Sequence, residues 1–178
     1  MSKNVKWFVA KGMLIKTQST RAMAPKYLEK SRNNLVLMDV LSDLQTNIKA
    51  REILHISSDF DVSEWIIICA YYAMYMAASA ALAAINYRSK NHSATIVSLD
   101  TFFVKKEMLE SEFLEMINNA KFEKEQIWQL DMARNRRETA QYSVTKLTTK
   151  TMAEKTRKDA YEFVERIEEL YVFLSKKS

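Results

Sequence analysis

The hydrophobic pattern of this chain is dominated by one run, residues 65–85, that contains no charged side chain. Such a run is long enough to cross a bilayer or to form the buried central helix of a bundle. Eight of its residues are alanine, and its three tyrosines lie toward the middle, whereas a membrane helix favours tyrosine at its two ends. We therefore expect a buried helix and no membrane, with Asp61 and Glu64 forming a capping box at its start.

Alanines in this run recur at three- and four-residue spacing, which places them on one narrow helix face. These alanines are Ala73, Ala77, Ala80, Ala81 and Ala84. Small side chains let helix backbones approach closely, so the pattern predicts a tightly packed neighbouring helix on this face.

Helical periodicity continues on both sides of the central run. A helix is expected to start at Pro25 and to reach about Leu54, with residues 55–60 as a loop. Ser93 is predicted to cap a shorter helix, and Phe113 begins an apolar group that marks another. Further helices are expected over residues 123–140 and 152–174, separated by a connector of β-branched residues at 142–149. The last helix is expected to bury one stripe of residues: Ala160, Phe163, Val164, Ile167, Leu170 and Phe173 or Leu174. The pattern predicts an all-α fold, an up-and-down bundle of four to five long helices.

Composition supports this fold class and limits the chemistry. One Gly and one Pro in 178 residues are too few for the turns of a sheet with several hairpins. The single cysteine, Cys69, lies in the buried run, so no intrachain disulfide can form, and a cytoplasmic location is expected. Two isolated histidines and one buried cysteine do not provide ligand spacing, so no metal and no cofactor are expected.

Positive charge is concentrated near the N-terminus. The first 32 residues contain eight Lys or Arg and one acid, Glu29, whereas the whole chain carries only +5. We divide the chain into a basic N-terminal arm, residues 1–23, and a helical bundle, residues 24–178. The arm can contact phosphates or an acidic partner, or it can be a solvated terminus without function.

Four blocks of the sequence, taken in order, resemble the HEPN domain family (higher eukaryotes and prokaryotes nucleotide-binding). The blocks are Ala70-Tyr71-Tyr72-Ala73-Met74-Tyr75 with Ala77-Ala78, Lys90-Asn91-His92-Ser93-Ala94, Phe103-Val104-Lys105, and Arg137-Glu138-Thr139-Ala140-Gln141-Tyr142. The resemblance implies a helical bundle that commonly forms a homodimer, either free-standing or encoded beside a minimal nucleotidyltransferase in a toxin–antitoxin pair.

Many members of this family are metal-independent ribonucleases whose motif is an Arg, four to six intervening residues and a His. In this chemistry the Arg stabilises the charge on phosphorus and the His moves a proton. Here, Arg137 is followed by four intervening residues and then by Tyr142 instead of His. A tyrosine with an ordinary pKa near 10 transfers protons poorly at neutral pH. The chain is therefore not expected to be an efficient ribonuclease.

The residues proposed for nucleotide or RNA binding are Arg134, Arg137, Gln141 and Tyr142. Arg137 would contact a phosphate, and Tyr142 would stack on a base or ribose. The alternative is that the arginines only complement the negative end of a helix and pair with nearby acids. If the protein is a ribonuclease, Arg137, Tyr142 and His92 are the catalytic candidates, although His92 also suits a structural role at the start of a helix.

Three functions remain open from the sequence. The first is a nucleotide- or RNA-associated protein, non-catalytic or weakly active, that works with a nucleotidyltransferase in a toxin–antitoxin-like module. The second is a metal-independent endoribonuclease. The third is a module that serves only protein interaction or dimerisation.

Overall fold

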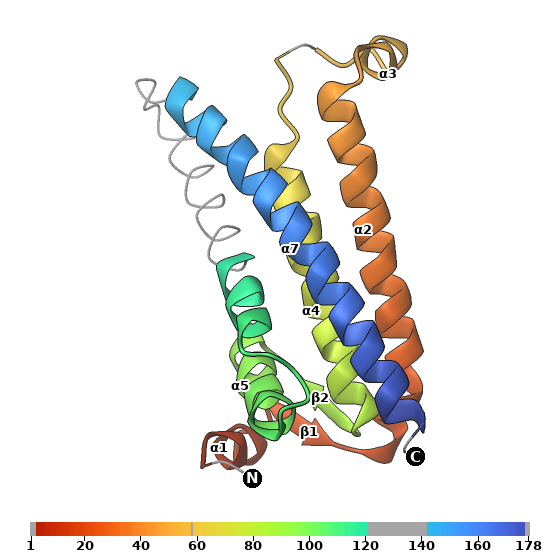
Figure 1. Cartoon of the computed structure of the whole chain (residues 1–178), viewed down its shortest axis with the longest axis vertical. Coiled ribbons are helices and arrows are strands. Elements are labelled where there is room, and N and C mark those ends of the chain that lie inside the picture. The colour runs from red at the N-terminus through yellow and green to blue at the C-terminus, as the bar shows by residue number, and fades with distance from the viewer. Residues whose placement is uncertain (1–2, 58, 121–141, 177–178) are drawn as a thin grey trace.

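The computed structural model describes residues 3–57, 59–120 and 142–176, and three long helices form its framework (Figure 1). They are α2 (Ala24–Thr46), α4 (Ser63–Ala84) and α7 (Tyr142–Lys176). Helix α4 packs against both α2 and α7 and is the central helix. The predicted all-α bundle is confirmed.

Helix α4 is buried along most of its length, as its uncharged sequence predicts. By length and composition alone it could cross a membrane, but 72% of its most apolar stretch is covered by the rest of the protein. All five alanines of the predicted narrow face are buried. At Ala73 the carbonyl oxygen accepts a hydrogen bond of 2.8 Å from the Ser31 hydroxyl of α2, which requires the two helices to lie very close. Small side chains therefore set the α2–α4 distance.

The start of α4 is organised by Asp61 and Gln45. The Asp61 carboxylate accepts hydrogen bonds from the Ser63 backbone N–H at 2.9 Å and from the Gln45 amide at 3.2 Å, and the Val62 N–H donates to Gln45 Oε1 at 3.1 Å. Burial alone would raise the pKa of Asp61, but the hydrogen bonds outweigh it and lower the pKa. The cap residue is Val62, so Asp61 binds the first helical N–H from one position earlier than the capping box predicts, and Gln45 of α2 is a partner that the pattern did not include.

Helix α2 begins beside Pro25 as predicted but ends earlier than expected. It stops at Thr46, and a separate short helix, α3 (Ile48–Ile53), follows. Asn47 separates the two because its side chain accepts a hydrogen bond of 3.1 Å from the Ala50 N–H and so caps α3. Asparagine side chains compete with the backbone in this way and favour helix starts over helix interiors.

The prediction that residues 142–149 form a connector before the last helix is wrong. Residues 142–149 belong to α7, which begins at Tyr142. β-Branched residues lower helix propensity by only a few tenths of a kcal/mol each, and extending an existing helix adds one hydrogen bond per residue. The helix expected over residues 123–140 lies outside the described residues.

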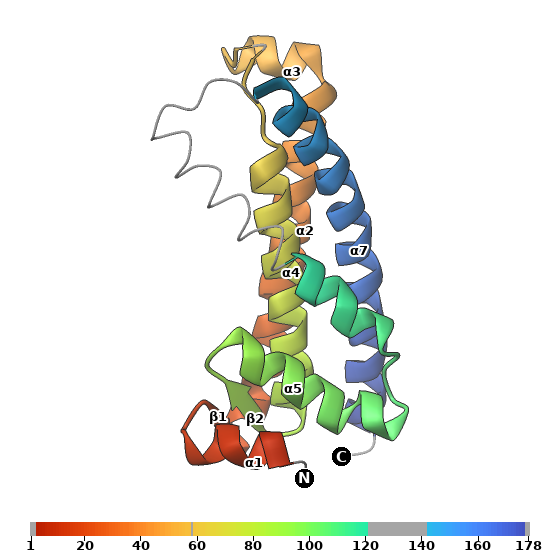
Figure 2. The ribbon, with the colours of Figure 1, turned by 90° about the vertical axis from the view of Figure 1, so that its left-hand side faces the viewer.

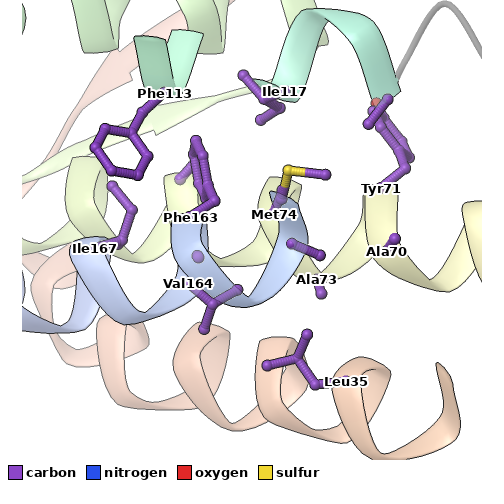
Figure 3. Close-up of a cluster of buried hydrophobic side chains, with 14 of the residues drawn as sticks. Leu35, Ala70, Tyr71, Ala73, Met74, Phe113, Ile117, Phe163, Val164 and Ile167 are labelled. Atoms are coloured by element: carbon purple, nitrogen blue, oxygen red, sulfur yellow. The ribbon is translucent and has the colours of Figure 1, made fainter. Parts of the chain in front are cut away.

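The core lies between α2, α4, α7 and a helical segment at 112–120 (Figure 3). Phe163 of α7 meets Phe113 edge to face with ring centroids 6.1 Å apart, and Met74 of α4 and Ile117 lie close by. The buried side of α7 agrees with its predicted stripe. Its buried residues include Ala160, Phe163, Val164, Ile167 and Leu170.

The residues before α2 are folded onto one end of the bundle, opposite α3 (Figure 2). Helix α1 (Lys3–Ala10) and strand β1 (Leu14–Lys16) are joined through Gly12, whose φ of +65° suits a residue without a Cβ. Strand β1 pairs antiparallel with β2 (Tyr87–Ser89), which follows α4. A 3₁₀ helix, η1 (Gln18–Met23), then leads into α2.

Candidate functional site

His92 is the one candidate catalytic residue whose side chain lies within the described part of the chain. It is the first residue of α5 (His92–Phe102), which leads through Phe103 to a short 3₁₀ helix, η2 (Val104–Lys106). The cap of α5 is Asn91, whose side chain accepts a hydrogen bond of 2.8 Å from the Ala94 N–H. The prediction that Ser93 is the cap is wrong, because the chain becomes helical one residue before Ser93.

Both ring nitrogens of His92 lie near polar atoms of other elements. Nδ1 is 3.3 Å from the Tyr71 hydroxyl of α4, and Nε2 is 3.4 Å from Asn118 Oδ1 of segment 112–120. An amide oxygen can only accept, so Nε2 donates to Asn118, while the Tyr71 hydroxyl can donate to Nδ1 or accept from it. The two contacts link three helical segments through one imidazole.

Aromatic rings surround His92 on its α4 side. The Tyr75 ring stacks on the imidazole at 6.3 Å with an angle of 18° between the planes, and Tyr71 stacks on Tyr75 at 6.0 Å and 14°. Tyr72 contacts Tyr71 edge to face and is partly exposed. Offset stacking of this kind stabilises ring positions beyond simple burial. His92 is therefore held in place by its aromatic and polar neighbours.

The side chains of the other predicted site residues lie outside the part of the chain that the structure describes. Arg134, Arg137 and Gln141 lie outside the described residues, as does the side chain of Tyr142. Tyr142 is nevertheless the first residue of α7, and this end of α7 lies toward α3, whereas α5 lies nearer to α1 (Figures 1 and 2). Within one chain, the helix starts that carry His92 and Tyr142 are at different levels of the bundle.

Two further features bear on chemistry. Cys69 is buried, and burial raises the pKa of its thiol, which keeps it protonated and poorly nucleophilic. Across the part of the chain that the structure describes, no three His, Cys, Asp or Glu side chains gather into a metal-ligand group.

Sequence reasoning missed the partners of His92. Asn118 lies 26 residues away and carries no periodic signal of its own. Tyr71 and Tyr75 did have a signal, since a spacing of four residues places them on one helix face. The identity of the facing element, however, depends on how α5 folds back against α4.

The comparison with known families agrees with this architecture. The model of the HEPN domain matches residues 45–170, from the end of α2 to the last turns of α7. This chain belongs to the HEPN domain family. Neither the curated proteins nor the solved structures gave a match. The matched residues include the central helix α4, His92 with its neighbours, and most of α7, whereas α1, β1 and most of α2 precede the match.

Proposed function

We propose that this HEPN protein binds RNA or a nucleotide without cleaving RNA efficiently, as one component of a two-protein module with a nucleotidyltransferase. Family membership supports the general association with nucleotides or RNA. The observation that carries the non-catalytic part is Tyr142, which stands where an Arg-x₄-His motif starting at Arg137 would have its histidine.

The surroundings of His92 support the same proposal. A general base needs a free lone pair on one ring nitrogen and access to the reacting hydroxyl. In His92, Nδ1 faces the Tyr71 hydroxyl and Nε2 faces the Asn118 amide oxygen, so both ring nitrogens have polar neighbours within the protein. An imidazole held in this way is better suited to joining α4, α5 and segment 112–120 than to moving protons in a ribonuclease reaction.

Association as a homodimer is part of the proposal, with a second copy covering an apolar surface of α2. Val36, Leu37 and Val40 are 62%, 49% and 49% exposed, and they lie on the side of α2 opposite its buried residues. A two-fold interface brings the same patch of both copies together, which suits an apolar patch on one turn of a helix. Large exposed apolar side chains grouped in this way favour association.

The direct test is incubation of purified protein with labelled single-stranded RNA in EDTA, read on denaturing and native gels. We expect a native-gel shift without cleavage. Arg137→Ala should weaken binding by about tenfold, because a charge-assisted contact to phosphate is lost. Arg136→Ala is the matched control, since it removes the same charge from the neighbouring position and should have a smaller effect.

Two more variants separate binding from catalysis. Tyr142→His rebuilds the Arg-x₄-His spacing, and we expect it to gain metal-independent cleavage that Arg137→Ala abolishes. Cleavage by the wild type that disappears in both Arg137→Ala and His92→Ala would instead establish the second candidate, an endoribonuclease. No binding and no cleavage would leave the protein-interaction function.

A further inference from the structure

An open groove lies between the start of α2 and the end of α7, at the end of the bundle that also carries α1 (Figures 1 and 2). Its volume is about 740 Å³, and apolar atoms form most of its lining. Leu28 of α2 is buried, whereas Val172 and Phe173 of α7 are 49% and 43% exposed. The groove therefore has room for an apolar side chain of another molecule.

Acidic side chains outnumber basic ones along this groove. Its charged residues are Arg32, Lys176, Glu165, Glu168 and Glu169. Arg32 is already paired with Glu168 at 2.6 Å, and Glu169 contacts Arg166 at 3.6 Å. Glu165 is exposed and forms no ion pair with any residue in the described part of the chain. The groove thus suits an apolar group that is flanked by positive charge.

Helix α1 presents a group of this kind on its outer side. Val5 is fully buried where α1 packs on α5 and β1. Trp7 lies about 200° further around the helix, so it is on the opposite side, and it is 52% exposed. Lys6 precedes Trp7 and is exposed, and Lys11 follows one turn later, where its backbone N–H donates to the Trp7 carbonyl at 3.0 Å. An indole with a lysine before it and another one turn after it therefore faces away from the fold.

The two surfaces belong to different sides of the same end of the bundle. Helix α1 packs on α5 and β1, whereas the groove is formed by α2 and α7 (Figures 1 and 2). Two copies that meet through this end about a two-fold axis can place each α1 against the groove of the other copy. A two-fold axis makes such a contact twice, so its contribution to association is doubled.

We propose that this groove binds α1 of a second copy of the chain, with Trp7 in the groove and Lys6 and Lys11 beside its glutamates. The contact uses neither the Arg137 motif nor the exposed patch of α2, so it goes beyond the proposed function. Two buried indoles contribute about 300–500 Å², less than the roughly 1,200–2,000 Å² of a stable interface. The contact therefore forms at high protein concentration, where it links the α2 dimers into larger assemblies.

The first test uses a chain that carries Val40→Asp, so that association through α2 is weakened. Sedimentation velocity over a wide range of protein concentration measures the remaining association. We expect a dimer at high concentration, and Trp7→Ala should lower its association constant by at least about tenfold, because a buried tryptophan is a typical hot spot. Trp65→Ala is the matched control, since Trp65 of α4 is 56% exposed and lies outside both surfaces.

An exchange of charges tests the pairing of the two surfaces. Lys6→Glu with Lys11→Glu should weaken the dimer by at least about tenfold, and so should Glu165→Lys with Glu169→Lys, because each pair of changes brings like charges together. The chain with all four substitutions has the net charge of its parent and should regain most of the association. Circular dichroism of each variant confirms that the fold is retained.

A cross-link identifies which residues meet. The native Cys69 is buried, so engineered surface cysteines are the reactive thiols. A Trp7→Cys chain mixed with a tagged Val172→Cys chain should form a disulfide between the two copies under mild oxidation with oxidised glutathione. Lys155→Cys, at an exposed position nearer the other end of α7, is the control partner and should react more slowly.

Three outcomes would overturn the inference. They are equal effects of Trp7→Ala and Trp65→Ala, equal cross-linking of Val172→Cys and Lys155→Cys, and no recovery of association when the four charge changes are combined. A Val40→Asp chain that is monomeric at every concentration would also overturn it, and would leave the groove to a different protein. These measurements contain no RNA, so their failure is distinct from a failure of the proposed RNA binding.

Discussion

Arg166 shows how a single charged side chain connects distant parts of the chain. Its guanidinium donates to both carboxylate oxygens of Glu110, at 2.8 and 3.1 Å, and to the Met108 carbonyl at 3.0 Å. These contacts hold the loop after η2 against α7. The hydrogen bonds from Arg166 lower the pKa of Glu110 below its ordinary value of 4.5.

The lowered pKa makes the stability of the protein sensitive to acid. Glu110 binds its proton more weakly in the folded chain than in the unfolded chain, so its contribution is complete above pH 4.5 and is lost as the pH falls through the lowered pKa. Glu110→Gln should therefore lower the melting temperature near pH 7 by about 1–2 °C, the size expected of an exposed ion pair. The difference from the wild type should disappear near pH 3 in thermal melts.

The pKa of Asp159 is shifted in the opposite direction from that of Glu110. Burial raises the pKa of its carboxyl, so the charged form is less stable in the folded chain, and this cost is present once the pH is above the raised pKa. Asp159→Asn should raise the melting temperature near pH 7. If Glu110→Gln and Asp159→Asn both lowered the melting temperature by a similar amount across the whole pH range, the causes given for the two pKa shifts, Arg166 and burial, would be contradicted.

Helix α4 is the element on which the bundle depends. Its alanine face is covered, and the Ser31 hydrogen bond to the Ala73 carbonyl shows how closely α2 approaches. Larger side chains on this face would push the helices apart, because protein interiors are packed as densely as organic crystals. The spacing of the alanines thus determines both the position and the tightness of the neighbouring helix.

Ala77→Leu tests this packing. Ala77 is fully buried, and the added volume should destabilise the protein by about 1–3 kcal/mol, the usual cost of overpacking a core. Urea unfolding monitored by circular dichroism measures the effect. Ala10→Leu, at an exposed position of α1, is the control and should change stability by less than about 0.5 kcal/mol. Equal effects of the two substitutions would mean that the α4 contact is loose.

At the scale of the whole molecule, the two ends of the bundle differ in character. The N-terminal segment, the β ribbon and the C-terminal end of α7 lie together, while α3 and the start of α7 lie at the other end (Figure 1). The exposed apolar patch of Val36, Leu37 and Val40 lies on α2, which joins the two ends.

Val40→Asp tests the proposed dimer. A charge placed in the middle of an apolar interface must be desolvated on association, so the variant should shift the protein toward monomer. Size-exclusion chromatography with light scattering measures the mass across a dilution series. Thr46→Asp adds the same charge at the exposed end of α2 and should leave the mass unchanged. A wild type that is monomeric at every concentration would rule out this interface.

Much of the bundle followed from local patterns in the sequence. The uncharged run predicted a buried central helix, Pro25 predicted the start of α2, and the stripe containing Phe163 and Ile167 predicted the buried side of α7. The start of α7 and the break at Asn47 were not predicted. Helix ends depend on small differences between caps and propensities, which neighbouring elements easily outweigh.

The sequence by itself determined the fold class, the burial of α4 and the absence of a histidine at position 142, because these depend on composition, periodicity and spacing. Only the tertiary structure decided which residues meet across the fold. His92 meets Asn118, and Lys16 lies on the same ribbon as Arg88, through contacts between segments with no shared local pattern. Such contacts arise when separate elements bury their apolar faces together, and polar and charged residues far apart in the chain are then brought side by side.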